Sequence, residues 1–459
     1  AQLFQRACDI GDGQGSAYAC NNLGILQNSS VLGLPDATAA LESYARACDL
    51  GRAFGCSNAA RLLRNEEPPN DYAAAFDFAE RGCEMNDGVG TGWSCYRLAG
   101  IQYHGEGLAS PNYEAALDNF VQACELGVAI GCRDAGWVLR NRDEMVDAER
   151  SMSFYELGCE LGEGESCRVL GRMLEGGETD QGRDQSGALE AYRLGCDIGD
   201  QWSCLYAAYI LNSGPNSLRN PSEARGIYSD LCDLAESTAP VARACLALGE
   251  LRIDGNMSPA NLALAAEAFS LGCSLDVQGE SEESCYRLAV LYASDAPNGG
   301  ADGILALGLF REVCEGTTGW FTEDACYNAG SLAYENYLSS YGREIGSAAD
   351  AARYFLASCE LDNIDACGEL ARVAVEARSG IGPEAEQIAA DALLRAAQLG
   401  DLNWVDWFGD LFDRDDDFHR EVVRILQRVF TDQGNYSGAI DGLWGPNTRD
   451  AFNFQRGPG

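Results

Sequence analysis

Apolar and small residues recur at helical spacing along most of the chain, and glycine interrupts them at regular intervals. In one example, apolar positions within residues 39–48 fall three or four apart, which is the spacing of one face of an α-helix. Gly51 follows where that helix would end, because glycine adopts the left-handed conformation of a helix C-terminus without a steric penalty. A second apolar stripe occupies residues 56–63. The pattern predicts two antiparallel helices joined by a short turn.

This hairpin recurs ten times, and each copy carries two cysteines. The first cysteine falls in the last turn of the first helix and the second in the first turn of the next. Successive first cysteines are 35 to 45 residues apart, a period typical of two-helix repeats of the tetratricopeptide kind. The residue before the second cysteine is always Ala, Gly or Ser. The ten pairs are Cys8 with Cys20, Cys48 with Cys56, Cys83 with Cys95, Cys124 with Cys132, Cys159 with Cys167, Cys196 with Cys204, Cys232 with Cys245, Cys273 with Cys285, Cys314 with Cys326, and Cys359 with Cys367.

Three states of these cysteines are compatible with the count. Local disulfides are favoured, because strict pairing of an even number of cysteines is typical of an oxidising compartment. Zinc sites would need Cys-x-x-Cys spacing or histidines, but no pair has that spacing and His104 and His419 are the two histidines. Reduced core cysteines would have no reason to occur in pairs. The spacing therefore favours a secreted chain, periplasmic or extracellular, with one disulfide in each hairpin.

The repeating unit Ala-x-x-x-Tyr-x-x-Ala-Cys-x-Leu-Gly…Gly-Cys-x-x-x-Ala resembles the Sel-1-like repeat, in particular its secreted, cysteine-rich bacterial members. The resemblance covers residues 1–414 and implies an all-α, superhelical α/α solenoid that serves as a protein-binding scaffold. An eleventh unit, residues 385–412, keeps the pattern but has Ala397 and Val405 at the cysteine positions, as expected of a capping repeat. Trp404, Trp407 and Phe408 are expected to pack in this cap.

The pattern changes at Asp417. An amphipathic helix over residues 421–430 precedes a glycine-rich loop, and a short helix ends the chain. The order Leu-Gln, then Gly-x-Tyr-x-Gly-x-x-Asp-Gly-x-x-Gly-Pro-x-Thr, then Phe-Gln resembles the peptidoglycan-binding type-1 domain. The resemblance implies a small three-helix domain over residues 417–459 with a shallow cleft for the glycan or its stem peptide. Its candidate ligands are Tyr436, Asp441, Gly442, Trp444 and Thr448, although the same residues could instead simply hold the fold.

The net charge of the 459-residue chain is −39, and every basic residue is arginine. Nucleic acids and anionic membranes are bound by basic patches, so we expect neither as a partner. The acidic surface is either a solvated coat or an attraction for a basic partner or divalent cations. No apolar run approaches the length of a membrane span. The chain begins inside a predicted helix, at Leu3–Cys8, so we expect a preceding portion.

The residue inventory argues against most enzymes. The two histidines lie in different modules, lysine is absent, and the cysteines are expected to be oxidised. Histidine-dependent triads, lysine chemistry and free-thiol catalysis are therefore excluded, including the Ser-x-x-Lys and Lys-Thr-Gly chemistry of the penicillin-binding and β-lactam-hydrolysing proteins discussed among cysteine-rich Sel-1-like proteins. A carboxylate pair of the glycosidase kind remains open, but no spacing marks one. We predict no catalytic residue, metal or cofactor; Asp413–Asp417 lacks the glycine and glutamate of a calcium loop.

The expected function is that of a non-enzymatic scaffold that binds protein through the solenoid and peptidoglycan through the C-terminus. The alternatives are a cell-wall hydrolase or its activator, and a structural subunit of an extracellular assembly. Trp93, Trp137 and Trp202 fall in second helices and are expected in the core between repeats, where a partner could otherwise contact them. Trp320 and Phe321 lie in a longer turn and are the candidate partner contacts.

Overall fold

The computed structural model describes residues 1–11, 13–32, 34–65, 70–178, 182–253, 259–294, 302–316, 319–338, 346–400, 407 and 417–453. These residues are helical or irregular, and no strand occurs among them. The chain divides into two compact units, residues 1–227 and 228–459. The division falls within α13 (Pro221–Cys232), one helix of a repeat.

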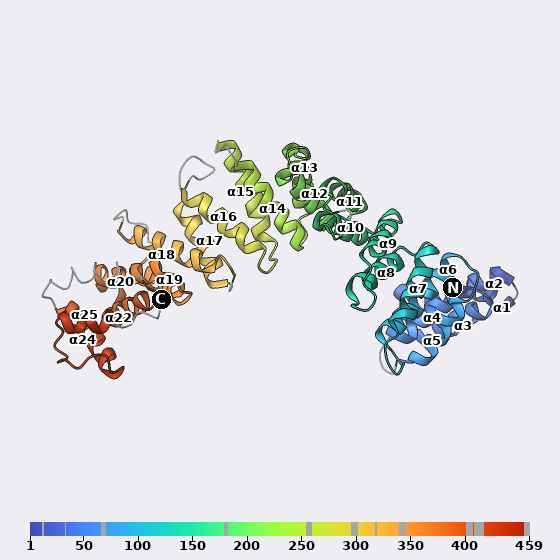
Figure 1. Ribbon diagram of the computed structural model, residues 1–459, viewed down its shortest axis with the longest axis horizontal. Helices are drawn as coiled ribbons and strands as arrows, with labels where there is room; N and C mark the ends of the chain where they lie inside the picture. Colours follow the sequence, from blue (N-terminus) through green and yellow to red (C-terminus); the bar gives the residue numbers. More distant parts are fainter. Residues whose placement is uncertain are drawn as a thin grey trace. The chain divides into compact units, whose positions relative to one another are not determined.

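The first unit is an array of helical hairpins in which successive helices from α1 to α12 pack against one another (Figure 1). A 3₁₀ helix, η1 (Ser30–Leu32), follows the first hairpin. Its α-helices are α1 (Gln2–Ile10), α2 (Gly13–Gln27), α3 (Ala37–Asp49), α4 (Ala53–Asn65), α5 (Tyr72–Cys83), α6 (Val89–His104), α7 (Tyr113–Glu125), α8 (Ala129–Asn141), α9 (Ala148–Glu160), α10 (Gly164–Gly176), α11 (Gln185–Ile198) and α12 (Gln201–Ser213).

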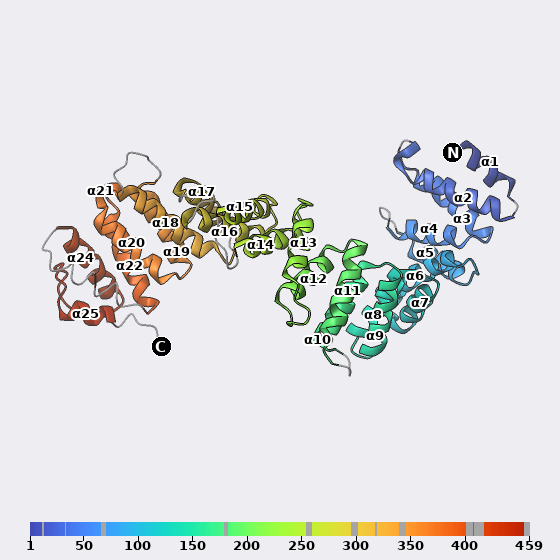
Figure 2. The same cartoon turned by 90° about the horizontal axis from the view of Figure 1, so that it is seen from above.

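The second unit, taken by itself, is also an array of helical hairpins (Figure 2). Its helices are α14 (Ala239–Ile253), α15 (Pro259–Ser274), α16 (Ser281–Ser294), α17 (Gly303–Gly316), α18 (Thr322–Leu338), α19 (Ala348–Glu360), α20 (Ile364–Glu376), α21 (Arg378–Ile381), α22 (Ala385–Gln398), α24 (Asp417–Asp432) and α25 (Pro446–Asn453). An all-α repeat solenoid is thus the fold, as predicted from the sequence. None of the described helices combines the length and apolarity needed to cross a bilayer.

Asp or Asn side chains begin many of the first helices. Asp36, Asn112 and Asp147, for example, each accept a hydrogen bond from the backbone N–H three residues later. Such a cap satisfies one of the four backbone donors left free at a helix N-terminus. In two of these helices a proline directly precedes the cap, Pro35 before Asp36 and Pro111 before Asn112.

In the structure, the twenty cysteines are joined in ten disulfides, each within one hairpin, and the paired Cα atoms lie 4.5 to 4.8 Å apart. The two helix ends must approach closely to reach this distance. The pairing is the one expected from the spacing, and the described cysteines include no free thiol. The bridges join Cys8 to Cys20, Cys48 to Cys56, Cys83 to Cys95, Cys124 to Cys132, Cys159 to Cys167, Cys196 to Cys204, Cys232 to Cys245, Cys273 to Cys285, Cys314 to Cys326, and Cys359 to Cys367.

The residues just before the two cysteines explain that approach. Gly158, before the first cysteine of its hairpin, faces Ser166, before the second, and a Cβ at Gly158 would lie 2.5 Å from the Ser166 Oγ. In another hairpin the order is reversed: a Cβ at Gly55 would lie 2.6 Å from the Cβ of Ala47. In six of the ten hairpins one of these two residues is glycine, so the small residues have a steric reason. The sequence pattern had shown only the small residue before the second cysteine.

A second glycine contact joins successive hairpins. In these contacts a glycine in the middle of a second helix lies directly under an aromatic ring of the next first helix, and the ring is buried. A Cβ at Gly24 would lie 2.6 Å from the ring of Tyr44. The pairs are Gly24–Tyr44, Gly136–Tyr155, Gly171–Tyr192, Gly249–Phe269 and Gly330–Phe355. The absent side chain makes room for the largest core residue of the neighbouring repeat.

The C-terminal helices share a core with the repeats. α24 packs against α22, and Phe418, Val422 and Leu426 of α24 join the hydrophobic cluster that contains Leu393. Trp407 packs against the same cluster, half-buried, as expected for a cap. The remaining positions predicted for the cap and for the segment after it lie outside the described residues; they are Trp404, Val405, Phe408 and the aspartates at 413–416.

Candidate partner-binding pocket

A pocket of about 410 Å³ opens in the first unit along the second helices of three successive hairpins, α6, α8 and α10. Pockets of 300–1,000 Å³ lined by apolar residues with a few polar groups are typical ligand sites. α4, α7 and α9 contribute one residue each. The lining residues are Arg64, Tyr96, Arg97, Gly100, Tyr103, His104, Phe120, Arg133, Asp134, Trp137, Tyr155, Glu165 and Val169.

One end of the pocket is basic. The side chain of Arg64 on α4 forms an ion pair with Glu106, with its Nη2 2.8 Å from Oε1. The guanidinium of Arg97 on α6 lies over the rings of Trp93 and Tyr96, 5.7 and 5.6 Å from their centroids. Burial lowers the pKa of Arg97, and the nearby Arg64 and Arg61 lower this pKa further by repulsion. This end therefore carries more positive charge than its surroundings neutralise.

Aromatic rings line the next part of the pocket. Trp137 on α8 is 43% exposed and meets the Tyr103 ring edge-on, with centroids 5.7 Å apart. The Arg142 guanidinium lies 4.8 and 4.1 Å from the ring centroids of Tyr103 and Tyr113. These cation–π contacts hold Tyr103 behind Trp137. Trp137 therefore presents an apolar surface to the pocket, whereas the sequence pattern had favoured a core position for it.

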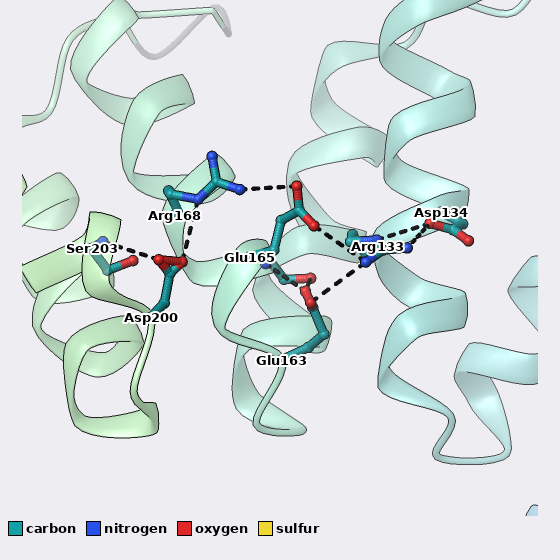
Figure 3. A network of polar contacts seen from close by, with 8 residues as sticks. Arg133, Asp134, Glu163, Glu165, Arg168, Asp200 and Ser203 are labelled. Carbon is teal, nitrogen blue, oxygen red and sulfur yellow. Dashed lines mark hydrogen bonds and ion pairs between the residues drawn. The ribbon is translucent and has the colours of Figure 1, made fainter. Parts of the chain in front are cut away.

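The other end carries an ion-pair network that runs across three hairpins (Figure 3). Arg133 on α8 contacts Asp134 at 2.8 Å and Glu165 on α10 at 3.2 Å. Arg168 then contacts Glu165 at 2.9 Å and Asp200, which precedes α12, at 3.3 Å. Two arginines meet four carboxylates in this network, because Glu163 also lies 3.8 Å from Arg133, so this end keeps an excess of acidic groups.

The pKa values at this end reflect burial. Burial raises the pKa of Asp134, although Arg133 and a hydrogen bond from Tyr96 oppose the shift. Burial, with repulsion from Asp134, likewise raises the pKa of Tyr96 to about 12. Tyr96 therefore stays a neutral hydrogen-bond donor at physiological pH.

The acids of the network also begin helices. Glu163 caps α10 by accepting from Ser166 N at 2.6 Å, and Asp200 caps α12 by accepting from Ser203 N at 3.2 Å. Each carboxylate thus binds an arginine of the preceding hairpin and the first turn of its own helix. The network fixes the rotation of one hairpin relative to the next and so shapes the pocket.

Asp200→Ala is expected to lower the free energy of unfolding of the first unit by about 1–2 kcal/mol, because both the helix cap and the contact with Arg168 are lost. Chemical denaturation followed by circular dichroism measures this change. Asp197→Ala removes an exposed carboxylate from the neighbouring helix and should change stability by less than about 0.5 kcal/mol. Equal effects of the two substitutions would contradict the role assigned to Asp200.

The predicted peptidoglycan ligands converge on Gln427, a fully buried residue of α24. Its Nε2 lies 3.0 to 3.2 Å from the Tyr436 hydroxyl, Asp441 Oδ1, the Leu443 carbonyl and Thr448 Oγ1, and its Oε1 accepts from Gly442 N at 3.0 Å. Four of the five predicted ligands thus direct polar groups inward to shape the loop. In the sequence, Gln427 stands out only as the second residue of the Leu-Gln motif.

The outer surface of the loop includes an exposed apolar side chain. Trp444 is half-buried, with its ring 5.7 Å from that of Phe452, whereas Leu443 is 57% exposed. Asp441 is exposed and accepts from Leu443 N at 2.9 Å. A ligand would therefore meet Leu443 and the outer side of Asp441 first.

Loop stability should depend on acid pH through Asp441. Hydrogen bonds from Gln427 and from the Leu443 backbone lower the pKa of Asp441 below its ordinary 3.8. Because the folded-state pKa lies below the unfolded value, this stabilisation is complete above about pH 4 and is lost as pH falls through the folded-state pKa. Hydrogen exchange of residues 434–448, corrected for intrinsic rates, should show protection falling below pH 4.

Asp441→Asn should remove this acid-dependent change, while exchange in α20 provides an internal reference. An unchanged pH profile in the variant would contradict the assignment.

The two candidate partner contacts in the longer turn, Trp320 and Phe321, have different environments in the structure. Trp320 is 97% exposed. Phe321 packs on Tyr286 of the preceding second helix, with ring centroids 5.2 Å apart. Of the two side chains, Trp320 is therefore the one open to solvent, and Phe321 anchors the turn. Among the described residues, no three His, Cys, Asp or Glu side chains gather as metal ligands.

Comparisons with known proteins support the fold. No protein-family model matches the chain. Its structure is similar to that of a protective antigen of uropathogenic Escherichia coli that displays an SLR fold, with a TM-score of 0.57, 19% identity, and coverage of 99% of this chain and 90% of that chain. A Sel1 repeat protein from Oxalobacter formigenes aligns with 51% of this chain and 99% of its own, at 16% identity and a TM-score of 0.41. The first likeness establishes a Sel1-like repeat fold.

A shorter likeness in sequence extends to eukaryotes. Cytochrome c oxidase assembly factor 7 of Xenopus tropicalis is 29% identical over 116 residues, which is 24% of this chain and 48% of that protein. The chain thus spans about half the length of the curated relatives it matches.

Proposed function

We propose that the chain is a non-enzymatic scaffold in an oxidising compartment, periplasmic or extracellular, that binds a protein partner through its repeats. The pocket along α6, α8 and α10 is the observation that carries this proposal. It combines an exposed indole with a basic end, and partly exposed aromatic and arginine side chains often dominate the energy of protein–protein interfaces. The repeat solenoid is a fold used for extended binding surfaces.

The test of scaffold function uses the pocket itself. The oxidised full chain and its Trp137→Ala variant are immobilised in parallel, and bound envelope proteins are identified by mass spectrometry. A protein recovered by the parent chain and lost with Trp137→Ala supports the proposal, and Trp320→Ala reports separately on the exposed turn. Identical recovery by all three chains would contradict a partner site at either place.

We also propose that residues 417–459 associate with peptidoglycan. The support is the resemblance of the loop to peptidoglycan-binding domains and its exposed Leu443 beside a rigid Gln427-centred frame. The chain should sediment with purified sacculi, and Leu443→Asp should abolish sedimentation without unfolding the module. Point variants are preferable to truncation, because α24 shares its core with α22. Release of soluble muropeptides would instead indicate a hydrolase or hydrolase activator.

A further inference from the structure

We infer that the basic end of the pocket binds a carboxylate of a partner's peptide segment, with Arg97 as the residue that pairs with it. The inference rests on the proposed scaffold function and specifies what that scaffold recognises. It concerns a site that the sequence pattern did not indicate, since Arg97 follows Tyr96 on an ordinary helical face.

Arg97 lacks the acidic partner that several other half-buried arginines have. The half-buried guanidiniums of Arg52, Arg64, Arg133, Arg168 and Arg372 each form an ion pair with a carboxylate. The structure gives Arg97 neither an ion pair nor a hydrogen bond with any described residue, and its Nε is buried without an acceptor. Acids are not scarce in this chain, which has 71 acidic and 32 basic residues.

A partly buried charge without an opposite charge beside it destabilises the folded chain. For Arg97, neighbouring groups of the same sign add to this cost. Arg61 and Arg64 lie near Arg97 and repel it. Glu106 contacts Arg64 with both carboxylate oxygens, so it neutralises that arginine rather than Arg97. A carboxylate that enters the pocket would supply the missing charge and accept charge-assisted hydrogen bonds from Arg97.

The remaining walls select among anions. Asp134 and Glu165 line the far side of the pocket, and although arginines pair with them, they disfavour a doubly charged phosphate more than a singly charged carboxylate. Trp137 and Tyr103 offer aromatic surface between the two ends. The volume of about 410 Å³ accommodates a short stretch of side chains. The expected ligand is therefore a peptide in which an acidic group lies next to an apolar side chain.

The test selects peptides without assuming a sequence. Two random peptide libraries, one with free and one with tethered C-termini, are selected by mRNA display against the oxidised full chain. We expect enrichment of Asp or Glu beside an apolar residue in both libraries, or of a free C-terminal carboxylate in the first alone. The two results distinguish a side-chain carboxylate from a terminal one.

Affinity of the selected peptides then tests Arg97 directly. Arg97→Met keeps the aliphatic packing and should weaken binding by about 10- to 100-fold, as expected for loss of one charge-assisted interaction. Arg97→Lys should retain part of the preference for acids. Arg225→Met removes an exposed arginine of α13 and should leave affinity unchanged. Because Arg97 has no acidic partner in the unbound chain and methionine keeps the packing on Trp93 and Tyr96, Arg97→Met should unfold at the same temperature or higher, which separates lost binding from lost folding.

Three results would overturn the inference. The first is selection of no peptide, or of peptides without an enriched acidic group. The second is a folded Arg97→Met variant that binds the selected peptides as tightly as the parent. The third is full displacement of those peptides by soluble muropeptides with an affinity that Arg97→Met does not change, which would indicate a glycan site. If capture of an envelope protein persists in any of these cases, the scaffold function stands and only the carboxylate assignment fails.

Discussion

Reduction of the ten disulfides is expected to unfold most of the repeat array at 37 °C. Each bridge closes a short loop, with sequence separations of 8 to 13 residues, and should stabilise its hairpin by about 2–3 kcal/mol in the chain-entropy model. In a repeat protein each unit contacts only its neighbours, so these losses accumulate along the array. Circular dichroism at 222 nm, with and without a phosphine reductant, measures the effect.

Removing one disulfide should have a smaller effect of the same kind. The double substitution Cys159→Ala, Cys167→Ala removes one bridge from the middle of the first unit and should cost about 2–3 kcal/mol. Both cysteines are buried, so alanine leaves small cavities and little else. If the reduced chain kept its helical signal at 37 °C, and the double variant unfolded like the parent, the bridges would not be what stabilises the hairpins.

Gly171→Ala is expected to destabilise the first unit by about 1–3 kcal/mol, although alanine is the better helix former. A Cβ at Gly171 would overlap the fully buried ring of Tyr192, which belongs to the next hairpin. Either the ring or the whole hairpin must shift, so packing between repeats is lost. Chemical denaturation of the full chain measures the change in the free energy of unfolding.

The matched control lies five residues further along the same helix. A Cβ at Gly176 would meet its nearest neighbour, Glu178 Cγ, at an ordinary 3.5 Å, and Gly176→Ala should be neutral or stabilise by up to about 1 kcal/mol. Tyr192→Ala, which removes the ring instead, should cost about 3–5 kcal/mol. If Gly171→Ala and Gly176→Ala had the same effect, the glycine–aromatic contact would not determine how repeats stack.

Local features of the fold were predictable because the sequence encodes them within a few residues. The cysteine spacing predicts each hairpin, since both members of a pair fall at helix ends joined by one turn. Gly51 and Asp36 mark a helix end and a helix start for equally local reasons. The contact between Gly171 and Tyr192 was less visible, because it joins two helices of different repeats and depends on their relative rotation.

The pocket could not be predicted for the same reason. Arg64, Arg97 and Asp134 are far apart in the sequence, and each looks like an ordinary residue on the polar side of a helix. Their juxtaposition depends on how α4, α6 and α8 stack. Trp137 was placed on a second helix from the sequence. Its exposure was not predictable, because nothing in the sequence distinguishes an exposed indole from one in the core.

The C-terminal loop illustrates a different limit. A motif match singles out Tyr436, Asp441 and Thr448 without saying whether they bind a ligand or hold the loop. The structure shows their polar groups directed to Gln427, so these residues hold the loop in its shape. Whether the outer surface of that frame binds peptidoglycan is a proposal that sedimentation with sacculi addresses.

The central claim is that each hairpin is closed by its own disulfide, and disulfide mapping tests it most directly. The chain is purified from its native compartment with free thiols blocked, digested without reductant, and its linked peptides are identified by mass spectrometry. We predict ten bridges, each between two cysteines of one hairpin, and no blocked thiol. Free thiols throughout the array, or bridges that join different hairpins, would contradict both the stabilising role of the cysteines and the proposed oxidising location.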